Sequence, residues 1–518
     1  MMKLGQPEAD TISGIFFAHA AATPEKIAVA CEGTTISYAQ LAQLVARWSN
    51  ALAANNVQRG DQIGVVLPNN VEFVALILVA ADLGAGLVPL SPALPPAVAL
   101  HALKAAQAKH LVSTSTQLAA LRAEPGSAAM QGCWLSIDAA GAASAATLEQ
   151  LLQPVPADVR PLHAGQADDA LILTMTSGST GSPKPIVLTQ RTKLNRVRAA
   201  VQLYGITAQD RTLAATPLYH SLAERLVLLP LLSGGSAVLM AHFSAQAWLR
   251  CVQVQQVTFT IAVSSQLKQI AAHMAQDEHD VSSLRCVVSS SALLENAVKV
   301  DLLARFSCEF HECYGASEIA IATNLDGHAA RTKLQSVGRP APGVELRILG
   351  ENDEQLPPGQ VGEIVCKTTM LFGGYFQLPE LTRAAMYGEY FRTGDIGKLD
   401  EDGYLYFLGR KKDVIITGGI NVYPADIEAA IASHGSVTES AAFAFPDARL
   451  GEVVAVAVVA RDPGSFDLRQ LRFHCANVLA DFQQPRRFFI IEKLPKNSMG
   501  KLMKFQLVQA YASSPERE

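Results

Sequence analysis

The sequence predicts a large α/β protein, in which a main domain built on a mostly parallel sheet is followed by a smaller α+β domain. Three observations lead to this prediction. Short apolar runs alternate with helical patterns along most of the chain, the pattern changes after Gly409–Asp413, and 49% of the 518 residues are apolar while only 17% are charged. This composition suits a large buried core, and a chain of this length is expected to form more than one domain.

Buried strands are expected to alternate with helices in the main domain. Residues 63–67 and 86–90 have the apolar character of buried strands, and residues 70–83 between them predict a helix. Similar strand patterns recur at 257–263, 285–288 and 308–313. This alternation implies parallel strands covered by helices on both faces, and ligands of such folds bind beyond the carboxyl ends of the strands. Residues 124–160, rich in Ala, Gly, Pro and Ser, are expected to be a variable connection.

The last part of the chain is predicted to form a compact α+β domain after a charged hinge. Lys412 marks the expected boundary, which divides the chain into residues 1–411 and 412–518. Helices are predicted from Pro424 to about Ser433 and from Asp467 to Leu479, and strands over residues 438–444, 453–460 and 487–491. A block of this size is typical of one domain.

Charge and cysteine content argue against several classes of function. A net charge of −5 argues against a nucleic-acid partner held by a basic surface. The eight cysteines are scattered without a Cys-x-x-Cys pair, which is typical of reduced thiols in a cytoplasmic protein. No secretory signal pattern opens the chain, and the longest apolar stretch, residues 73–90, is interrupted by Asp82 and Pro89, so no membrane span is expected.

The loop Thr176–Lys184 is the most informative segment for function. It combines hydroxyl side chains, two glycines and one lysine directly after the apolar run 171–175. Backbone N–H groups, hydroxyls and a cation at the end of a strand suit a polyphosphate ligand. The spacing differs from the Gly-x-x-x-x-Gly-Lys-Ser/Thr of P-loop proteins. Because small polar residues are also typical of linkers, the loop alone leaves a linker and a nucleotide site open, and a nucleotide kinase is compatible with it.

Several further segments, in their order and spacing, resemble the adenylate-forming superfamily. This superfamily contains acyl-CoA synthetases, adenylation domains of nonribosomal peptide synthetases and beetle luciferases. The resemblance extends from about Ser37 to Lys504 and is highly specific. The segments that carry it, besides the loop, are Thr216–His220, Glu312–Glu318, Tyr390–Asp395, Gly409–Asp413, Gly418–Pro424 and Leu494–Lys501.

The resemblance implies an architecture and a two-step reaction. A main domain with αβα layers and a β-barrel-like subdomain would be joined to a small mobile domain that carries a catalytic lysine. ATP and a carboxylate would give an acyl-adenylate and pyrophosphate, and a pantetheine thiol would then displace AMP. The implied cofactors and partners are ATP, Mg²⁺, a small carboxylic acid, and CoA or a phosphopantetheinyl carrier protein. The sequence does not indicate an oligomeric state.

The resemblance also assigns a nucleotide site. The loop would grip the β- and γ-phosphates, Tyr314 would stack on adenine, and Asp395 with Arg410 would bind the ribose. Outside this context, Tyr314 could equally be a core aromatic residue, Asp395 a turn residue and Arg410 part of a surface ion pair. The implied ATP- and AMP-binding residues are Thr176, Ser177, Gly178, Ser179, Thr180, Gly181, Lys184, Glu312, Cys313, Tyr314, Gly315, Ser317, Asp395 and Arg410.

Three residues are implied to be catalytic, and three to act in domain movement. Lys501 would bridge the carboxylate and the α-phosphate, Glu318 would bind Mg²⁺, and His220 would gate the carboxylate pocket. The alternatives are a solvated lysine, a surface glutamate and a packed core histidine. The small domain would rotate about Lys412 and bring Gly418 and Gly419 to the thiol entrance.

The acyl pocket is expected near residues 219–226, 289–293 and 312–319, which we call the acyl-pocket segments. Ser221 stands where amino-acid-activating relatives carry an Asp, which favours an acid without an α-amino group. Glu224 and Arg225 interrupt an apolar helix predicted over residues 222–232. They either pair with each other or with neighbours, or Glu224 holds a substrate amino group away from the α-position. The implied pocket residues are Tyr219, Ser221, Glu224, Ser289, Ser290, Ser291 and Ala316.

Two departures from the family pattern lie near the phosphate loop. Pro185 stands where Gly is usual, and Gln190 where His is usual. Proline removes a backbone donor and fixes φ, but neither residue removes Lys184.

Three functions remain open at this stage. The leading one is an AMP-forming ligase that transfers the acyl group to CoA. The second is a stand-alone enzyme that loads an acyl group, including a β-amino or aryl one, onto a carrier protein. The third is a non-catalytic adenylate-binding protein, against which the presence of Lys501, Glu318, Asp395 and Arg410 argues.

Overall fold

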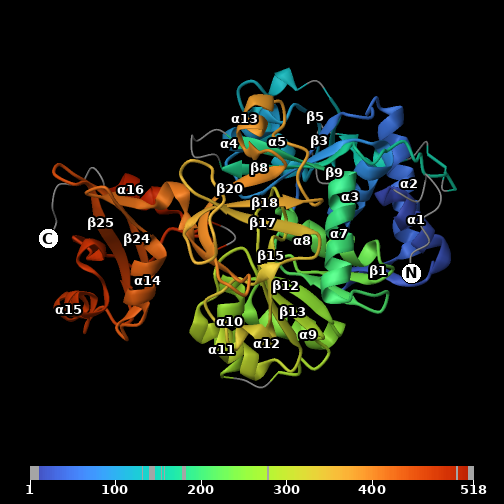
Figure 1. The fold of residues 1–518 in the computed structure, drawn as a ribbon. Coiled ribbons are helices and arrows are strands. Elements are labelled where there is room, and N and C mark those ends of the chain that lie inside the picture. Colours follow the sequence, from blue (N-terminus) through green and yellow to red (C-terminus); the bar gives the residue numbers. More distant parts are fainter. Residues whose placement is uncertain are drawn as a thin grey trace.

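Four sheets organise the described part of the chain in the computed structural model (Figure 1). Two large sheets and a smaller antiparallel sheet belong to the main domain, and the fourth sheet belongs to the small domain. The structure describes residues 11–130, 132–138, 146–152, 155–156, 158–177, 183–276, 279–497 and 500–511.

The first large sheet has seven strands, which are parallel apart from the last pair. This arrangement confirms the predicted parallel sheet, and the last pair is a hairpin that spans the predicted phosphate loop. The strand order is β7 (Ala146–Thr147), β6 (Trp134–Ser136), β5 (Ala108–Ser113), β3 (Gln62–Val66), β4 (Gly86–Leu90), β8 (Ala170–Ser177) and β9 (Pro183–Thr189).

The second large sheet has nine strands, and its central strands are parallel. Its order is β16 (Arg339–Pro340), β15 (Thr323–Asp326), β14 (Glu309–Tyr314), β13 (Cys286–Ser290), β12 (Phe259–Val263), β10 (Arg211–Ala214), β11 (Ser236–Leu239), β1 (Ile27–Cys31) and β2 (Thr34–Ser37). The carboxyl ends of β10, β12, β13 and β14 therefore lie at one edge of this sheet.

The helices α3 (Val71–Leu83) and α8 (Ser221–Leu231) are buried along almost their whole length. α3 contacts β1 of one large sheet and β4 and β8 of the other, so it lies between them. Its sequence is apolar on nearly every side, Asn70 accepts a hydrogen bond from the Phe73 N–H at its start, and Gly84 ends it in the left-handed conformation. The packing of α3 explains why residues 70–83 have the apolar character of a buried helix.

The other helices of the main domain cover the sheets. They are α1 (Ile12–Ala22), α2 (Tyr38–Ala54), α4 (Pro96–Ala105), α5 (Ser115–Ala123), α6 (Leu148–Leu152), α7 (Gln190–Tyr204), α9 (Ala245–Gln255), α10 (Ser264–Met274), α11 (Asn296–Arg305), α12 (Gly327–Ala330) and α13 (Pro379–Ala384). None of the described helices combines the length and apolar character needed to cross a membrane.

The third sheet is antiparallel and occupies the place of the expected barrel-like subdomain. It is formed by β17 (Val344–Leu349), β18 (Gly362–Thr368), β20 (Tyr390–Leu399) and β19 (Met386–Tyr387), with β21 (Leu405–Arg410) also paired to β20. The described strands at the two ends of this sheet do not pair with each other, so the sheet is open and does not close into a barrel. Asp395 and Arg410 face each other as register partners in β20 and β21.

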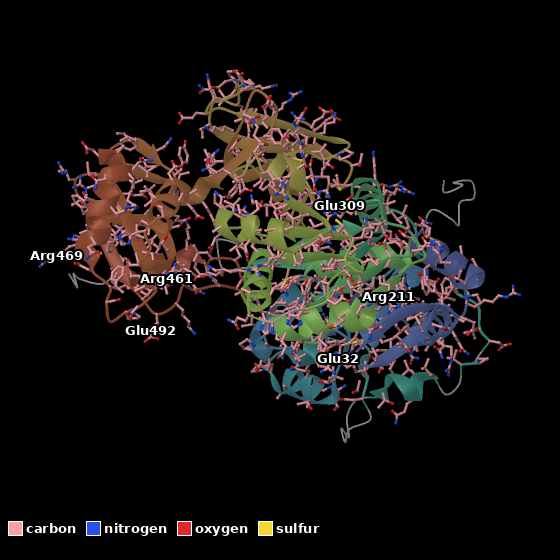
Figure 2. The ribbon with its side chains drawn as sticks, turned by 90° about the horizontal axis from the view of Figure 1, so that it is seen from below. Glu32, Arg211, Glu309, Arg461, Arg469 and Glu492 are labelled. Carbon is pink, nitrogen blue, oxygen red and sulfur yellow. The ribbon has the colours of Figure 1, made fainter. Side chains whose placement is uncertain are left out.

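The small domain follows the short turn η3 (Lys411–Asp413), in which the predicted boundary residue Lys412 lies. Figure 2 shows it set apart from the main domain, with the exposed residues Arg469 and Glu492 on its outer surface. Its elements are β22 (Ile415–Thr417), β23 (Ile420–Val422), α14 (Pro424–Ala432), β24 (Val437–Asp447), β25 (Gly451–Ala460), α15 (Leu468–Val478), η4 (Asp481–Gln483), β26 (Arg487–Ile490) and α16 (Lys504–Tyr511).

One expectation about the main domain is wrong. Residues 124–160 are not only a connection, because they contribute the strands β6 and β7 and the helix α6, together with the turn η2 (Ser127–Ala129). These elements contain two to five residues each, which is too short to produce a recognisable pattern of apolar side chains.

Replacing Leu76, which is fully buried in α3, by alanine should lower the free energy of unfolding by about 2–5 kcal/mol. The loss combines the burial of the side chain with the cavity left between the two large sheets. Urea unfolding measures it. Val98→Ala is the control, because Val98 is 50% exposed and its truncation should change stability by less than about 0.5 kcal/mol. Equal effects of the two changes would contradict the placement of α3.

Candidate active site

Polar residues follow four neighbouring parallel strands at the carboxyl edge of the nine-stranded sheet. His220 and Ser221 come after β10, Ser265 comes after β12, and Ser289 lies near the end of β13. The segment Tyr314–Glu318 leads out of β14. Because carboxyl ends of parallel strands meet at one edge, residues distant in the sequence are brought together there.

A buried carboxylate, Asp395, lies at the centre of the predicted nucleotide site. The Tyr314 hydroxyl donates a hydrogen bond of 2.6 Å to Asp395 Oδ2, and Arg410 Nε lies 2.9 Å from Oδ1. The Arg410 contact is an ion pair without hydrogen-bond alignment, and among the described residues Oδ1 has no hydrogen-bond donor. Oδ1 is therefore available to accept a hydrogen bond from a ligand hydroxyl.

Burial dominates the electrostatics of Asp395. Desolvation raises the pKa of this carboxyl group, while Arg410, the Tyr314 hydrogen bond and Lys501 oppose the rise. Desolvation also raises the pKa of Tyr314, so its phenol stays protonated and can donate. The ring of Tyr314 packs at 5.7 Å from the ring of Phe407.

Glu318, the predicted Mg²⁺ ligand, is held in place from two directions. The buried Arg196 donates hydrogen bonds to the backbone oxygens of Ser317 (2.8 Å) and Glu318 (3.2 Å), and the Phe372 N–H donates to the Glu318 oxygen (2.7 Å). The Tyr375 hydroxyl donates to Glu318 Oε1 at 3.1 Å. Arg196 and Tyr375 were not predicted from the sequence, because their partners lie far away along the chain.

Only part of the predicted phosphate loop is described. Gly178, Ser179, Thr180 and Gly181 lie outside the described residues, and of Thr176 and Ser177 only the backbone is described. The half-buried Lys184 lies on β9 opposite Thr176 on β8.

The departure at Gln190 has a structural explanation. The side chain of Gln190 is buried, accepts a hydrogen bond of 3.1 Å from the Ile12 N–H, and donates one of 2.9 Å to the Ala81 oxygen. It thus links α7 to α1 and α3.

Lys501 belongs to a loop of the small domain that touches the main domain at the carboxyl edge. A Cβ atom on Gly500 would lie only 2.3 Å from Ser265 Oγ, so the loop backbone packs directly against the start of α10. Asn497 shapes the loop, because its Oδ1 accepts from the Lys501 N–H and its own N–H donates to the Lys501 oxygen, both at 2.9 Å. Ser265 was not predicted from the sequence.

The electrostatics of Lys501 also place it beside the nucleotide site. The residue keeps contact with solvent, yet the surrounding protein and the charge of Arg410 lower the pKa of its amino group. Lys501 and Asp395 each shift the pKa of the other toward the charged form. The small domain is therefore oriented so that the charges of Lys501 and Asp395 act on each other.

Two predicted nucleotide contacts have side chains engaged elsewhere. Glu312 is buried, with Oε2 2.5 Å from Lys299 Nζ, and its Oε1 accepts a hydrogen bond of 3.1 Å from the Leu294 N–H. Cys313 is buried, and desolvation raises the pKa of its thiol while the neighbouring Ser290 and Tyr204 oppose the rise. A bound nucleotide could therefore contact the backbone atoms of Glu312 and Cys313 but not their side chains.

The predicted acyl-pocket residues gather around α8. The ring centroids of Tyr219 and His220 are 4.7 Å apart, and burial lowers the pKa of His220 to about 4. Ser221 Oγ accepts a weak hydrogen bond of 3.4 Å from Arg196. Ser289 is fully buried, Ser290 and Ala316 are half-buried, and Ser291 is exposed with a φ of +76°.

Glu224 is paired with a neighbouring helix. Its Oε2 forms a short ion pair with Lys193 of α7, and both side chains are almost completely buried. Desolvation lowers the pKa of Lys193 to about 8, while Glu224 opposes this shift. The pairing agrees with the first of the two interpretations of Glu224, in which the charges pair with neighbours.

The predicted hinge and thiol-entrance residues lie at the start of the small domain. Lys412 is exposed in η3, and Gly418 and Gly419 form the two-residue turn between β22 and β23. Both glycines have positive φ, +56° and +83°, as a tight hairpin turn of this type requires.

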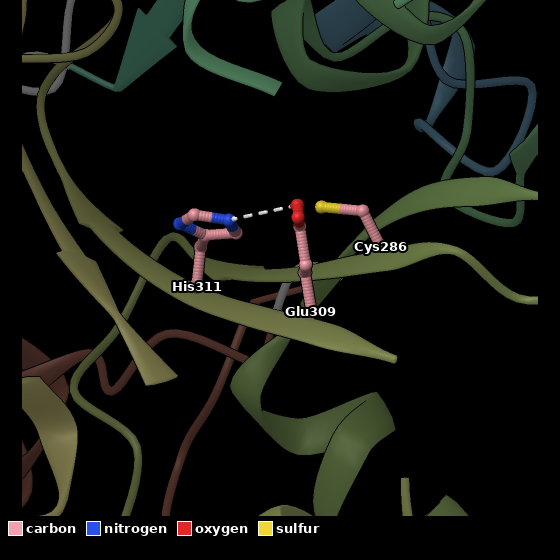
Figure 3. Close-up of side chains that lie close together, drawn as sticks. All are labelled: Cys286, Glu309 and His311. Atoms are coloured by element: carbon pink, nitrogen blue, oxygen red, sulfur yellow. Dashed lines mark ion pairs between the residues drawn. The ribbon is translucent and has the colours of Figure 1, made fainter. Parts of the chain in front are cut away.

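A group of possible metal ligands lies at the opposite, amino edge of the nine-stranded sheet (Figure 3). Cys286 and Glu309 are register partners at the starts of β13 and β14, and His311 lies two residues further on, so the three side chains share one face. Their ligand atoms lie within 4.8 Å of one another, and His311 Nε2 is 3.8 Å from Glu309 Oε2.

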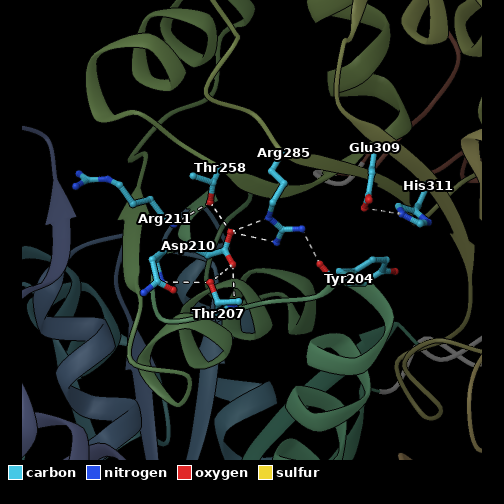
Figure 4. Close-up of polar contacts among 9 residues, drawn as sticks. Tyr204, Thr207, Asp210, Arg211, Thr258, Arg285, Glu309 and His311 are labelled. Carbon is cyan, nitrogen blue, oxygen red and sulfur yellow. Dashed lines mark hydrogen bonds and ion pairs between the residues drawn. The ribbon is translucent and has the colours of Figure 1, made fainter. Parts of the chain in front are cut away.

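A polar network around Asp210 adjoins this group (Figure 4). Arg285 binds Asp210 Oδ1 at 3.1 Å and the Tyr204 oxygen at 2.8 Å, and Thr258 donates to Asp210 Oδ1 at 2.7 Å. The positive charge of Arg285 lies close enough to Cys286 to influence its thiol, so it would repel a metal ion bound there. These contacts connect strand ends and stabilise the amino edge, away from Glu318.

Family comparisons agree with this geometry. Residues 16–376 match the family model described as AMP-binding enzyme, and residues 426–501 match that of the AMP-binding enzyme C-terminal domain. The chain is 33% identical over 488 residues to a feruloyl-CoA synthase of Amycolatopsis sp, covering 93% of this chain and 95% of the relative. It is 29% identical over 522 residues to the fatty acid–[acyl-carrier-protein] ligase ScoC of Streptomyces coeruleorubidus, covering 98% of each.

A solved structure is similar over nearly the whole chain. It is the o-succinylbenzoate CoA synthetase of Bacillus subtilis in complex with the acyl-adenylate intermediate OSB-AMP. The TM-score is 0.84 at 27% identity, and the similarity covers 97% of this chain and 98% of that one.

Replacing Lys193 by methionine should destabilise the protein by about 3–5 kcal/mol, because it leaves Glu224 buried and without its cation. Chemical denaturation measures the loss. The matched control is Lys268→Met, which breaks the exposed 2.7 Å ion pair with Glu295 and should cost at most about 1 kcal/mol. A Lys193→Met variant as stable as the control would show that Glu224 has another partner.

His220 should make stability depend on pH between about 4 and 6.5. Its pKa is lowered on folding, so within this window the unfolded chain binds the proton more readily, and the free energy of unfolding falls as the pH decreases. The difference in unfolding free energy between wild type and His220→Gln should therefore change across the window and become constant above it. The exposed His101→Gln is the control. A constant difference for His220→Gln throughout would refute the burial of the ring.

Proposed function

This chain belongs to the AMP-binding enzyme family and is an ATP-dependent acid–thiol ligase of the AMP-forming type, and we propose that it transfers the acyl group to CoA. The similarity to a feruloyl-CoA synthase over 93% of this chain supports CoA as the acceptor. The contact of the Lys501 loop with Ser265 at the carboxyl edge supports the adenylate-forming step. This orientation of the small domain suits the first half-reaction, in which a carboxylate must approach a triphosphate.

The described residues offer separate contacts for the ribose, the adenine and the Mg²⁺ ion of the nucleotide. Asp395 Oδ1 accepts from a ribose hydroxyl, and Arg410 lies beside it as a second ribose partner. Tyr314, held by its hydrogen bond to Asp395, presents its ring to the adenine. Glu318 offers a carboxylate oxygen of the kind that Mg²⁺ binds together with phosphate oxygens and water. Bound Mg²⁺ supplies positive charge to the phosphates.

In the first half-reaction, a carboxylate oxygen of the acid attacks the α-phosphorus of ATP. The bond from the α-phosphorus to the bridging oxygen breaks, and pyrophosphate leaves with that oxygen. Both reactants are anions, so the step needs positive charge at the α-phosphate and an aligned approach. Lys501 supplies the charge, and Lys184 with its loop retains the phosphates that leave.

In the second half-reaction, the small domain rotates about Lys412. Lys501 leaves the site, and the turn Gly418–Gly419 borders the path of the thiol. The thiol sulfur attacks the acyl carbonyl carbon, its proton goes to water, and AMP departs with the former carboxylate oxygen. The exposed side chains Ile416 and Ile420, on either side of the turn, gain a packing surface in this rotated state.

A carrier protein is the second candidate acceptor. It is favoured by the similarity over 98% of the chain to a ligase named for an acyl carrier protein. CoA and a carrier protein present the same pantetheine thiol, so the thiol path does not distinguish them. The two differ in the surface that surrounds the thiol, which a kinetic comparison of the acceptors can resolve.

Lys501→Ala should abolish formation of the acyl-adenylate while leaving thiol transfer from a supplied acyl-adenylate largely intact. The first half-reaction loses the charge that bridges the carboxylate and the α-phosphate, whereas in the second the lysine has already left the site. ATP–pyrophosphate exchange measures the first step, and thioester formation from synthetic acyl-adenylate measures the second. A loss of at least about 100-fold in the exchange rate is expected.

The exposed Lys493→Ala is the matched control for this experiment and should retain both half-reactions. Near-normal exchange in Lys501→Ala would remove Lys501 from the catalytic site. Equal loss of both half-reactions would show that the variant disturbs the fold rather than one step.

The function as a whole is tested by pyrophosphate release across aryl, short-chain, medium-chain and long-chain acids, each with and without CoA. Continuous release that depends on CoA supports the CoA ligase. A burst of one turnover that CoA does not extend indicates a carrier protein as acceptor. No release with any acid would favour an adenylate-binding protein without catalytic activity.

A further inference from the structure

Arg225 carries a largely buried charge, and its Nε has no hydrogen-bond partner in the part of the chain that the structure describes. Only 7% of the residue is exposed, and among the described residues no acceptor binds its Nε. A guanidinium group in this position loses its hydration, and the loss costs several kcal/mol unless another group replaces the water. A bound anionic ligand could replace the lost water and pair with this charge.

The charges around Arg225 leave it uncompensated. Lys193, Arg196 and Arg225 lie together with two carboxylates close enough to act on them, those of Glu224 and Glu318. Lys193 takes the Glu224 carboxylate as its ion-pair partner. Arg196 is satisfied by backbone oxygens, those of Ser317 at 2.8 Å and Met370 at 3.1 Å. Three positive charges and two carboxylates leave one positive charge in excess. Of the three cations, Arg225 has no hydrogen bond or ion pair with another described residue.

Arg225 lies among the acyl-pocket segments. It is close enough to Cys313 of β14 for the two to interact electrostatically, and Cys313 lies near Ser290 at the end of β13. Ser289, the preceding residue of β13, points to the other face of the sheet together with Glu312. The space between α8 and the ends of β13 and β14 thus presents a guanidinium group whose Nε lacks an acceptor among the described residues.

We propose that Arg225 binds a second anionic group of the acid, a carboxylate or a sulfonate at the end remote from the reacting carboxylate. The proposal rests on the proposed function and narrows its substrate class. A guanidinium group binds such anions through two parallel hydrogen bonds. Acids that end in a methyl or phenyl group leave this charge buried and unpaired.

An amino-bearing acid fits these charges less well. Glu224 is the acceptor that would hold its ammonium group, but Glu224 is fully buried and paired with Lys193. An ammonium group would also add a fourth cation beside Lys193, Arg196 and Arg225. The site therefore favours an additional negative charge over an additional positive one.

Matched pairs of acids test the proposal. We would measure kcat/KM for pyrophosphate release with hexanoate against adipate, hexanoate against 6-sulfohexanoate, and 3-phenylpropionate against 3-(4-carboxyphenyl)propionate. The wild type should prefer the dianionic member of a pair by about 10- to 100-fold, the range expected for hydrogen bonds to a charged group. The adipate and sulfohexanoate arms distinguish a carboxylate from a sulfonate.

In Arg225→Met, this preference should disappear or reverse, with the loss falling on the dianionic acid. The monoanionic acid should react as well as before or better. Arg198→Met, an exposed arginine on the neighbouring helix α7, is the matched control and should keep the wild-type preference. A wild type that prefers the monoanionic acids, or an Arg225→Met variant that loses both members of each pair equally, would overturn the proposal.

Stability without substrate separates a binding role from a structural one. If Arg225 awaits an anion, Arg225→Met removes an uncompensated buried charge, and the melting temperature should stay the same or rise. The preferred diacid should raise the melting temperature of the wild type but not of Arg225→Met. A melting temperature that falls in Arg225→Met, or a diacid shift that persists in it, would contradict the proposal.

These readouts also separate failure of the inference from failure of the proposed function. If no acid causes pyrophosphate release from the wild type, the ligase function fails. A thermal shift by the diacid that is lost in Arg225→Met would still support the anion site in that case. If plain acids are turned over well and no diacid is bound, the ligase stands and the anion site fails.

Discussion

The buried carboxylate of Asp395 is the constraint on which the rest of the site depends. It lies in the antiparallel sheet, accepts a hydrogen bond from Tyr314 at the end of the nine-stranded sheet, and pairs with Arg410 just before the turn that leads to the small domain. Lys501 of the small domain also stabilises its charge. A desolvated carboxylate is tolerated because these groups surround it. The proposed rotation of the small domain would remove one of them and would thus couple the position of the domain to the proposed nucleotide site.

Much of the fold was predictable because it rests on local patterns. The continuous apolar runs of β3 and β4 and the nearly all-apolar helix α3 show burial on both faces directly in the sequence. The strands β6 and β7 escaped prediction because pairing with a neighbouring strand, and not any pattern of their own, makes them strands. Gln190 looked like a change near the phosphates, but it is a buried link between three helices.

Short motifs in the sequence lead to the hypotheses for Lys501, Asp395 and Glu318. The candidate site was not predictable where the meaning of a residue depends on a distant partner. Arg196 holds the backbone at Glu318 across 122 residues, and Ser265 meets the Lys501 loop from another domain. The contrast between Glu224, which is paired, and Arg225, which is not, becomes visible only when burial and partners are known. The adjacent residues Glu224 and Arg225 are therefore assigned different roles, an internal ion pair for the first and the proposed binding of an anion for the second.

The central claim is that the carboxyl edge beside Asp395 forms an acyl-adenylate, and isotope transfer tests it most directly. The acid that the enzyme turns over is labelled with oxygen-18 in its carboxylate, and the nucleotide product is analysed by mass spectrometry. The account predicts AMP that carries one oxygen-18 in its phosphate, because the attacking carboxylate oxygen stays with the phosphorus when the thiol takes the acyl group. Unlabelled AMP, or ADP as the product, would contradict it.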